Sequence, residues 1–173
     1  TECLLNSFRS DGKLLICGNG GSAADADHIS GELLRGFVWE RPIPAKLKEQ
    51  LQAEHGQLGQ RVAQGIQQGL PVINLNTHSA LHSAFANDRD YAFVFAQMVM
   101  AYGREGDVLL SISTSGNSQN IIYATALAST LGLSTLALTG ESGGKLQDTA
   151  GLTIRVPGRE SYVDRESTRL NSS

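Results

Sequence analysis

The sequence has few of the residues that mark disulfide-rich, disordered or fibrous proteins. It contains four prolines and two cysteines in 173 residues. So little proline argues against a disordered or collagen-like chain. Cys3 and Cys17 are too few for a disulfide framework or a metal knuckle. A globular protein of a reducing, cytoplasmic compartment fits this composition best.

Long apolar runs and an excess of positive charge are also missing. No apolar run approaches the roughly 18–20 residues that cross a bilayer, and the start of the chain lacks a signal peptide's basic and apolar blocks. The 14 Lys and Arg residues against 17 Asp and Glu residues give a net charge of −3. We therefore expect neither nucleic acid nor a membrane as a partner, and any anion site must be local.

Apolar runs that alternate with helical spacing indicate the fold. Strands are predicted at residues 13–17, 70–75, 107–112, 135–138 and 152–156, with helical segments between them. Apolar strands without strict alternation, each followed by a helix, are typical of a parallel sheet that is covered on both faces. The sequence thus predicts an α/β fold, a doubly wound five-stranded parallel sheet sandwiched by helices.

The length allows one domain. We expect residues 1–163 to form it, with an N-terminal helix cut short, because Leu4, Leu5 and Phe8 have helical spacing at the very start. Residues 41–69 are polar and Gln-rich and predict an inserted amphipathic helix or broken helix pair. Residues 164–173 are predicted to be a non-native or disordered tail, and nothing after residue 157 offers a helix to cover the last strand.

Two loops stand where an α/β sheet binds ligands, beyond the ends of the first and third predicted strands. Residues 18–22 are Gly-Asn-Gly-Gly-Ser, and residues 113–118 are Ser-Thr-Ser-Gly-Asn-Ser. The hydroxyls of the second loop predict a phosphate cradle; the alternative is a serine-rich turn in which Ser118 only caps the next helix. In the first loop, Ser22 is predicted to be the helix N-cap, with Asp25 at the capping-box position.

Neither glycine-rich segment completes a nucleotide motif. Residues 18–23 fit a loose G-x-G-x-x-A pattern, but no acidic residue follows where a bound NAD ribose would need it. Lys145 follows two glycines, yet the first glycine of a P-loop is missing, and Leu146 stands where Ser or Thr is required. Dinucleotide binding and nucleotide hydrolysis are therefore not expected.

Several charged and polar residues leave their roles open. His28 and Glu32 are four residues apart on one helix face and could form a metal site, an acid–base pair or an ordinary surface pair. Asn87 and Asp88 are most simply the cap of the following helix. Arg35, Arg41 and Lys145 are candidates for holding an anion or for ordinary surface positions.

Taken together, these segments resemble the phosphoheptose isomerases, which are sugar isomerase (SIS) domain proteins. The resemblance extends from about residue 13 to residue 157, apart from the insertion. It rests on these segments: residues 16–28, 32–33, 87–88, 103–109, 112–118, 138–140, 143–145 and 156–157. The family converts sedoheptulose 7-phosphate to D-glycero-D-manno-heptose 7-phosphate for lipopolysaccharide, in the cytoplasm.

The resemblance implies a set of site residues. Glu32 matches the catalytic glutamate, which moves the carbon proton through an enediolate. His28, together with Glu32, matches ligands that hold zinc in some members, one ion per subunit. A homotetramer with active sites between subunits is implied as well. The expected substrate-binding residues are Asn19, Gly20, Gly21, Ser22, Asn87, Asp88, Ser113, Thr114, Ser115 and Ser118.

The sequence departs from the family in two places. The family has Gln-Glu-x-x-His soon after the fifth strand, and residues 164–169 do not match it, so the second acid–base group is missing. His78 stands where many members have a substrate-contacting Asp. The alternative to the enzyme is a non-catalytic SIS module, either a sugar-phosphate sensor or a protein that binds the replication initiator. The missing segment favours neither, whereas His28 and Glu32 favour the enzyme.

Overall fold

The computed structural model describes residues 2–157. The domain end predicted at residue 163 and the tail predicted at residues 164–173 lie outside this range. The described elements follow one another as α1 (Glu2–Arg9), β1 (Leu14–Gly18), α2 (Gly21–Leu34), α3 (Ala45–Gly65), β2 (Val72–Asn74), η1 (Leu75–Thr77), α4 (Ser79–Asp88), η2 (Tyr91–Phe93), α5 (Val94–Tyr102), β3 (Val108–Ser113), α6 (Gln119–Thr130), β4 (Ser134–Thr139), α7 (Leu146–Thr149) and β5 (Leu152–Arg155).

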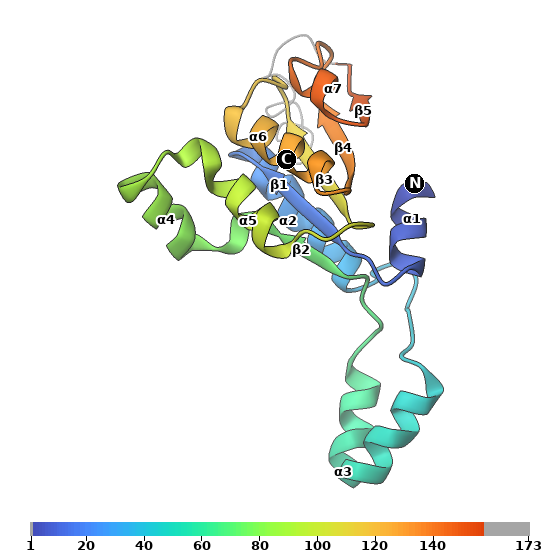
Figure 1. Ribbon diagram of the computed structural model, residues 1–173. Coiled ribbons are helices and arrows are strands. Elements are labelled where there is room, and N and C mark those ends of the chain that lie inside the picture. The colour runs from blue at the N-terminus through green and yellow to red at the C-terminus, as the bar shows by residue number, and fades with distance from the viewer. Residues whose placement is uncertain (1, 158–173) are drawn as a thin grey trace, which may run out of the picture.

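The five strands form one parallel sheet in the order β2-β1-β3-β4-β5 (Figure 1). From β1 the chain first adds β2 on one side and then returns to add β3, β4 and β5 on the other. The order therefore reverses between β1 and β3, and ligands of open α/β sheets bind at such a reversal. This confirms the predicted fold class.

Both faces of the central strands are buried. On one face, Leu14 and Ile16 of β1 pack with Ala26 and with partly buried residues of α1 and α2. On the other face, Leu15 and Cys17 pack in a larger core with residues of η1, α5, α6 and α7. This two-sided burial explains why β1 is apolar throughout and does not alternate.

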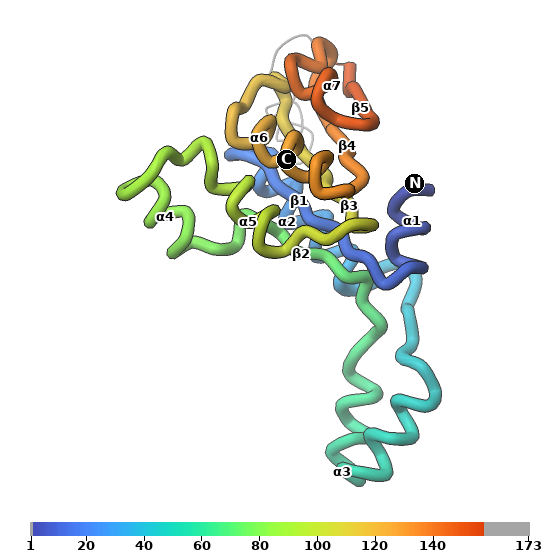
Figure 2. The backbone as a smooth tube through the Cα atoms, in the orientation of Figure 1, coloured from blue at the N-terminus to red at the C-terminus, as the bar shows by residue number. Residues whose placement is uncertain are grey.

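Segment α3 is a helical hairpin that projects from the domain (Figures 1 and 2). Gly56, with φ 55° and ψ −127°, interrupts the helix and reverses the chain. Residues with a Cβ rarely adopt this conformation, so the break is placed by glycine. Gly59 lies so close to the backbone of Leu51 that a side chain there would not fit, which lets the two arms approach each other. The segment predicted at 41–69 thus contains a helix pair.

The predicted strands and helices are found with small shifts. Two details were not predicted: the short helix α7, and the division of residues 91–102 into η2 and α5. Asp90 caps η2, its side chain accepting a hydrogen bond from Ala92 N over 2.9 Å. In the part of the chain that the structure describes, no helix combines the length and apolar character that a membrane crossing requires.

Candidate phosphate-binding and catalytic site

The two predicted loops meet at the reversal in strand order. Gly18 and Ile112 are register partners at the ends of β1 and β3, so the loops that follow lie side by side. They enclose a hollow of about 210 Å³. It is lined by Asn19, Ser22, Ile112, Ser113, Thr114, Ser115 and Ser118. The fold thus brings together six of the predicted substrate-binding residues.

The N-terminus of α2 opens at this hollow without a side-chain cap. Its N-cap is Gly20, with φ 54° and ψ −118°. The predictions that Ser22 is the N-cap and Asp25 its capping-box partner are wrong. Ser22 lies inside the first turn, where its N–H donates to Asn19 O over 3.0 Å. The sharp turn at Gly20 starts the helix earlier. Ser22, Ala23 and Ala24 donate their N–H groups to the carbonyls of Asn19 and Gly20, so this end of α2 favours an anion chiefly through the helix dipole.

The second helix that starts here, α6, has the same character. Ser118 is its N-cap residue, but the hydroxyl makes no capping hydrogen bond. Instead its Oγ lies 3.2 Å from Ser113 Oγ. The alternative in which Ser118 only caps the helix is therefore not what the structure shows. Two helix N-termini and several hydroxyls surround the hollow, and both can bind a phosphate group. Among the described residues, no Lys or Arg side chain lines the hollow.

A neighbouring loop holds residues 114–118 in shape. Gly116, with φ 64°, lies directly against the backbone of Gly143, where a side chain would collide. The N–H of Gly140 donates to Thr114 O over 2.9 Å, and Lys145 N donates to Asn117 Oδ1 over 3.1 Å. The hydroxyls are therefore presented by a backbone that is fixed before any ligand arrives.

Two asparagines that the sequence analysis did not single out support the first loop. Asn76 bridges to Gly18, donating to its carbonyl over 2.6 Å and accepting from its N–H over 3.2 Å. Asn120 and Asn19 exchange hydrogen bonds through their side-chain amides, over 2.9 Å each. The side chain of Asn19 is thereby largely occupied by Asn120. No local sequence signal distinguishes these two asparagines from surface residues.

A second hollow, of about 260 Å³, adjoins the first and shares Ser22, Ile112 and Thr114 with it. Asp25 of α2 lines this second hollow. His28 and Glu32 follow Asp25 at spacings of three and seven residues, so the three form a stripe along one side of α2.

Glu32 lies about 15 Å along α2 from Ser22, at the rise of an α-helix. Its Oε1 lies 3.8 Å from His28 Nε2, and both side chains are exposed, by 47% and 79%. The predicted catalytic pair is thus separate from the phosphate hollow. It lies farther along the same helix.

Asn87 and Asp88 do not reach either hollow. They form the exposed last turn of α4, where Asn87 Nδ2 donates to Asp88 Oδ1 over 2.9 Å. The prediction that they cap the following helix is wrong, because Asp90 does so. Arg41 is no anion site either: its guanidinium donates to the carbonyls of Leu33 and Gln68 over 2.6 and 3.0 Å.

A bound zinc ion would need more ligands than His28 and Glu32 provide. A protein zinc site has at least three protein ligands. Within residues 2–157, no three His, Cys, Asp or Glu side chains gather closely enough to hold a metal ion. His28 and Glu32 supply only two donors. By themselves the described residues therefore do not fit zinc.

Comparison with known proteins identifies the family. The SIS domain family model matches residues 62–140. The phosphoheptose isomerase of Halorhodospira halophila is 44% identical over 159 residues, covering 90% of this chain and 67% of the relative. That of Edwardsiella ictaluri is 42% identical, covering 95% and 70%. The chain belongs to the phosphoheptose isomerase family.

Solved structures of phosphoheptose isomerases agree with this assignment. The enzyme from Neisseria gonorrhoeae superposes with a TM-score of 0.73 at 33% identity, covering 98% of this chain and 76% of that one. The enzyme from Francisella tularensis gives 0.75 at 31%, with the same coverage. The predicted isomerase family and SIS fold are confirmed. This chain spans 62–70% of the length of three curated relatives that it matches.

Proposed function

We propose that this chain belongs to an aldose–ketose isomerase that converts sedoheptulose 7-phosphate to D-glycero-D-manno-heptose 7-phosphate, in the cytoplasm, for lipopolysaccharide synthesis. One observation supports this above all: a hollow built from hydroxyls and two helix N-termini adjoins the helix that carries Glu32. In this proposal the phosphate occupies the hollow, and the sugar extends along α2 toward Glu32.

The reaction requires a base next to the carbonyl end of the sugar. Glu32 would remove a proton from carbon 1 of the ketose, leaving an enediolate, and would return it to carbon 2. A second group must move a proton between the two oxygens. The described residues do not provide an obvious second group, so we assign it to chain outside residues 2–157 or to a neighbouring subunit.

The exposure of Glu32 supports a site that is completed by another surface. A general base works best when water is excluded and its pKa is tuned by its surroundings. In one chain, His28 and Glu32 both face solvent. The homotetramer with active sites between subunits, and zinc at His28 and Glu32, stay predictions of this proposal. A neighbouring subunit would cover Glu32 and would have to supply the further ligands that zinc at His28 and Glu32 needs.

Deuterium exchange tests the proposal. Sedoheptulose 7-phosphate is incubated with the protein in deuterated water, and NMR follows deuterium at the carbons beside the carbonyl. Exchange needs chiefly the carbon base, so it can survive the lack of the second group. We expect exchange with the wild type and none with Glu32→Gln. Glu49→Gln, on the distant arm of α3, is the matched control and should exchange normally.

Phosphorus NMR of the same samples separates binding from chemistry. Ser113→Ala combined with Ser118→Ala should abolish line broadening of the sugar phosphate. Exchange that is equal in wild type and Glu32→Gln would overturn the role of Glu32. Binding without exchange in the wild type would instead favour the non-catalytic module. That alternative draws on one observation, the absence of any carboxylate from the lining of the phosphate hollow.

A further inference from the structure

The hairpin α3 exposes apolar side chains although it projects from the domain. Leu47 of the first arm and Leu58 and Val62 of the second are exposed by 41%, 66% and 40%. Packing between α3 and any other described element is marginal at most. An arm of this kind that stays in solvent normally carries polar residues on its outer faces. These side chains therefore require a partner surface.

The hairpin is held in a fixed direction at its base. Arg41 donates to carbonyls at the end of α2 and to Gln68 O, and Gln68 N donates back to Arg41 O over 2.7 Å. Leu70 N donates to Leu33 O over 2.9 Å. The segments that lead into and out of the hairpin are thus both hydrogen-bonded to the end of α2. The hairpin can therefore present a defined surface to another molecule.

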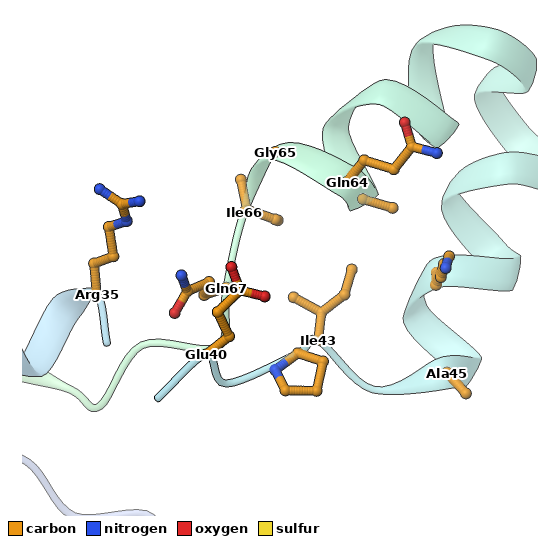
Figure 3. A pocket seen from close by; sticks show the side chains of 11 residues that line it. Arg35, Glu40, Ile43, Ala45, Gln64, Gly65, Ile66 and Gln67 are labelled. Atoms are coloured by element: carbon orange, nitrogen blue, oxygen red, sulfur yellow. The ribbon is translucent and has the colours of Figure 1, made fainter. Parts of the chain in front are cut away.

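A hollow of about 480 Å³ lies at this base (Figure 3). Its apolar lining includes Pro42, Ile43 and Ile66, with Ile43 and Ile66 reaching it from the two ends of α3. Arg35 and Lys48 also line it. The hollow thus combines these apolar side chains with polar ones, among them the two cations and the carboxylate of Glu40.

Charge is distributed unevenly along the hairpin. The base carries Arg35, Lys46 and Lys48 against the single carboxylate of Glu40. Glu49 and Arg61 offset each other between base and tip.

The tip carries Glu54, which accepts a hydrogen bond from Gln50 over 2.9 Å and lies 3.9 Å from His55 Nε2. Leu58 follows two residues after the turn at Gly56. An anionic tip with an exposed leucine complements a base that has an excess of positive charge and a hollow lined in part by Pro42, Ile43 and Ile66.

We propose that two copies of this chain associate by pairing their α3 hairpins antiparallel, the tip of each on the base of the other. Leu58 of each copy enters the hollow beside Ile43 and Ile66 of the other, and Glu54 of each pairs with Lys48 of the other. A two-fold axis makes both contacts at once, so the interface is self-complementary. The four arms together form an antiparallel four-helix bundle.

A charge exchange tests this arrangement. Sedimentation velocity at low salt, over the micromolar range, compares wild type, Glu54→Lys, Lys48→Glu and the variant with both changes. Each single change should raise the dissociation constant of one association step about tenfold, because it places like charges together at both ends. The double variant should associate like the wild type. Circular dichroism verifies that every variant is folded.

Leu58→Ser provides a second test that does not depend on charge. It should raise the dissociation constant of the same association step, whereas Met100→Ser, at an exposed position on α5, should not. The proposal would be overturned by a wild type that is monomeric throughout, by single variants that keep the wild-type dissociation constant, or by a double variant that associates no better than the singles. None of these measurements uses isomerase activity, so they are independent of the proposed function.

Discussion

Asn19 and Asn120 exchange two hydrogen bonds through their side-chain amides, each donating from Nδ2 to the other's Oδ1 over 2.9 Å. Asn19 belongs to the loop after β1, and Asn120 to the first turn of α6. The pair therefore joins the two loops of the phosphate hollow across 101 residues of sequence. Asn120 is only 7% exposed, so water cannot easily replace the missing partner.

Replacing Asn120 by Leu should destabilise the protein and weaken phosphate binding together. A buried amide left without its partner costs about 1–3 kcal/mol of unfolding free energy. Urea denaturation measures the loss, and phosphorus NMR of the sugar phosphate measures the affinity. In a double-mutant cycle, Asn19→Ala and Asn120→Ala should show a coupling of at least about 0.5 kcal/mol. Effects that simply add would contradict a coupled pair.

The loop of residues 113–118 requires glycine at position 116, both for its positive φ and for a close contact. Substitutions at Gly116 and Gly106 separate these two reasons. Gly106 and Gly116 both have positive φ, 87° and 64°. A side chain at Gly106 meets open space, whereas one at Gly116 meets the backbone of Gly143. Gly106→Ala should cost about 1–2 kcal/mol from φ strain alone.

Gly116→Ala should lower the unfolding free energy clearly more. It should also abolish binding of the sugar phosphate, because the loop of Gly116 must move away from the loop of Gly143. Thermal denaturation and phosphorus NMR check both effects. Equal losses of stability, with binding retained in both variants, would show that the contact between the loops is not needed for the cradle.

The parts of the site that depend on composition could be predicted from the sequence. Glycine and serine clusters after apolar runs locate residues 18–22 and 113–118, and the sheet topology brings them together. Asn76 and Asn120 could not be predicted, because their partners lie 58 and 101 residues away.

The prediction that Ser22 is the N-cap is wrong for a local reason. Serine is a favourable N-cap residue, but the backbone turn that starts α2 occurs two residues earlier, at Gly20. Likewise, the composition of residues 41–69 indicates helices, but only the φ of Gly56 shows that they form a hairpin.

Asp107 should be important for stability and not for binding. Its carboxylate accepts hydrogen bonds from Lys13 N, Lys13 Nζ and Arg104 N over 2.9, 2.6 and 2.8 Å. These lie at the N-terminal ends of β1 and β3, whereas the hollow lies at their C-terminal ends. It is 2% exposed. Asp107→Asn should lower the unfolding free energy by roughly 2–3 kcal/mol, because a charge-assisted set of bonds is lost.

Phosphorus NMR of the folded Asp107→Asn variant should show unchanged sugar-phosphate binding. Lys13→Met, which removes only the side-chain donor, is the graded control and should have a smaller effect on urea denaturation. A variant as stable as the wild type would show that Asp107 does not stabilise the start of β1 and β3.

Cys17 should make the protein less stable in alkali. Burial raises the pKa of its thiol to about 12 from an ordinary value of 9.0, against a smaller opposing effect of the hydrogen bond with Ser111. Between these values the folded thiol keeps its proton while the unfolded one loses it. The unfolded state then binds fewer protons, so the stabilisation that is complete below pH 9.0 is lost as the pH rises toward 12.

The slope near pH 10 should be roughly 1 kcal/mol of unfolding free energy per pH unit from this one group. Urea denaturation at a series of pH values measures it as the difference between wild type and Cys17→Ala, which cancels the other groups that titrate there. Cys3→Ala, at a partly exposed position, should keep the wild-type slope. Because a thiol that ionised in the folded state would contribute no slope, identical pH profiles for wild type and Cys17→Ala would show that Cys17 is not held neutral by the core.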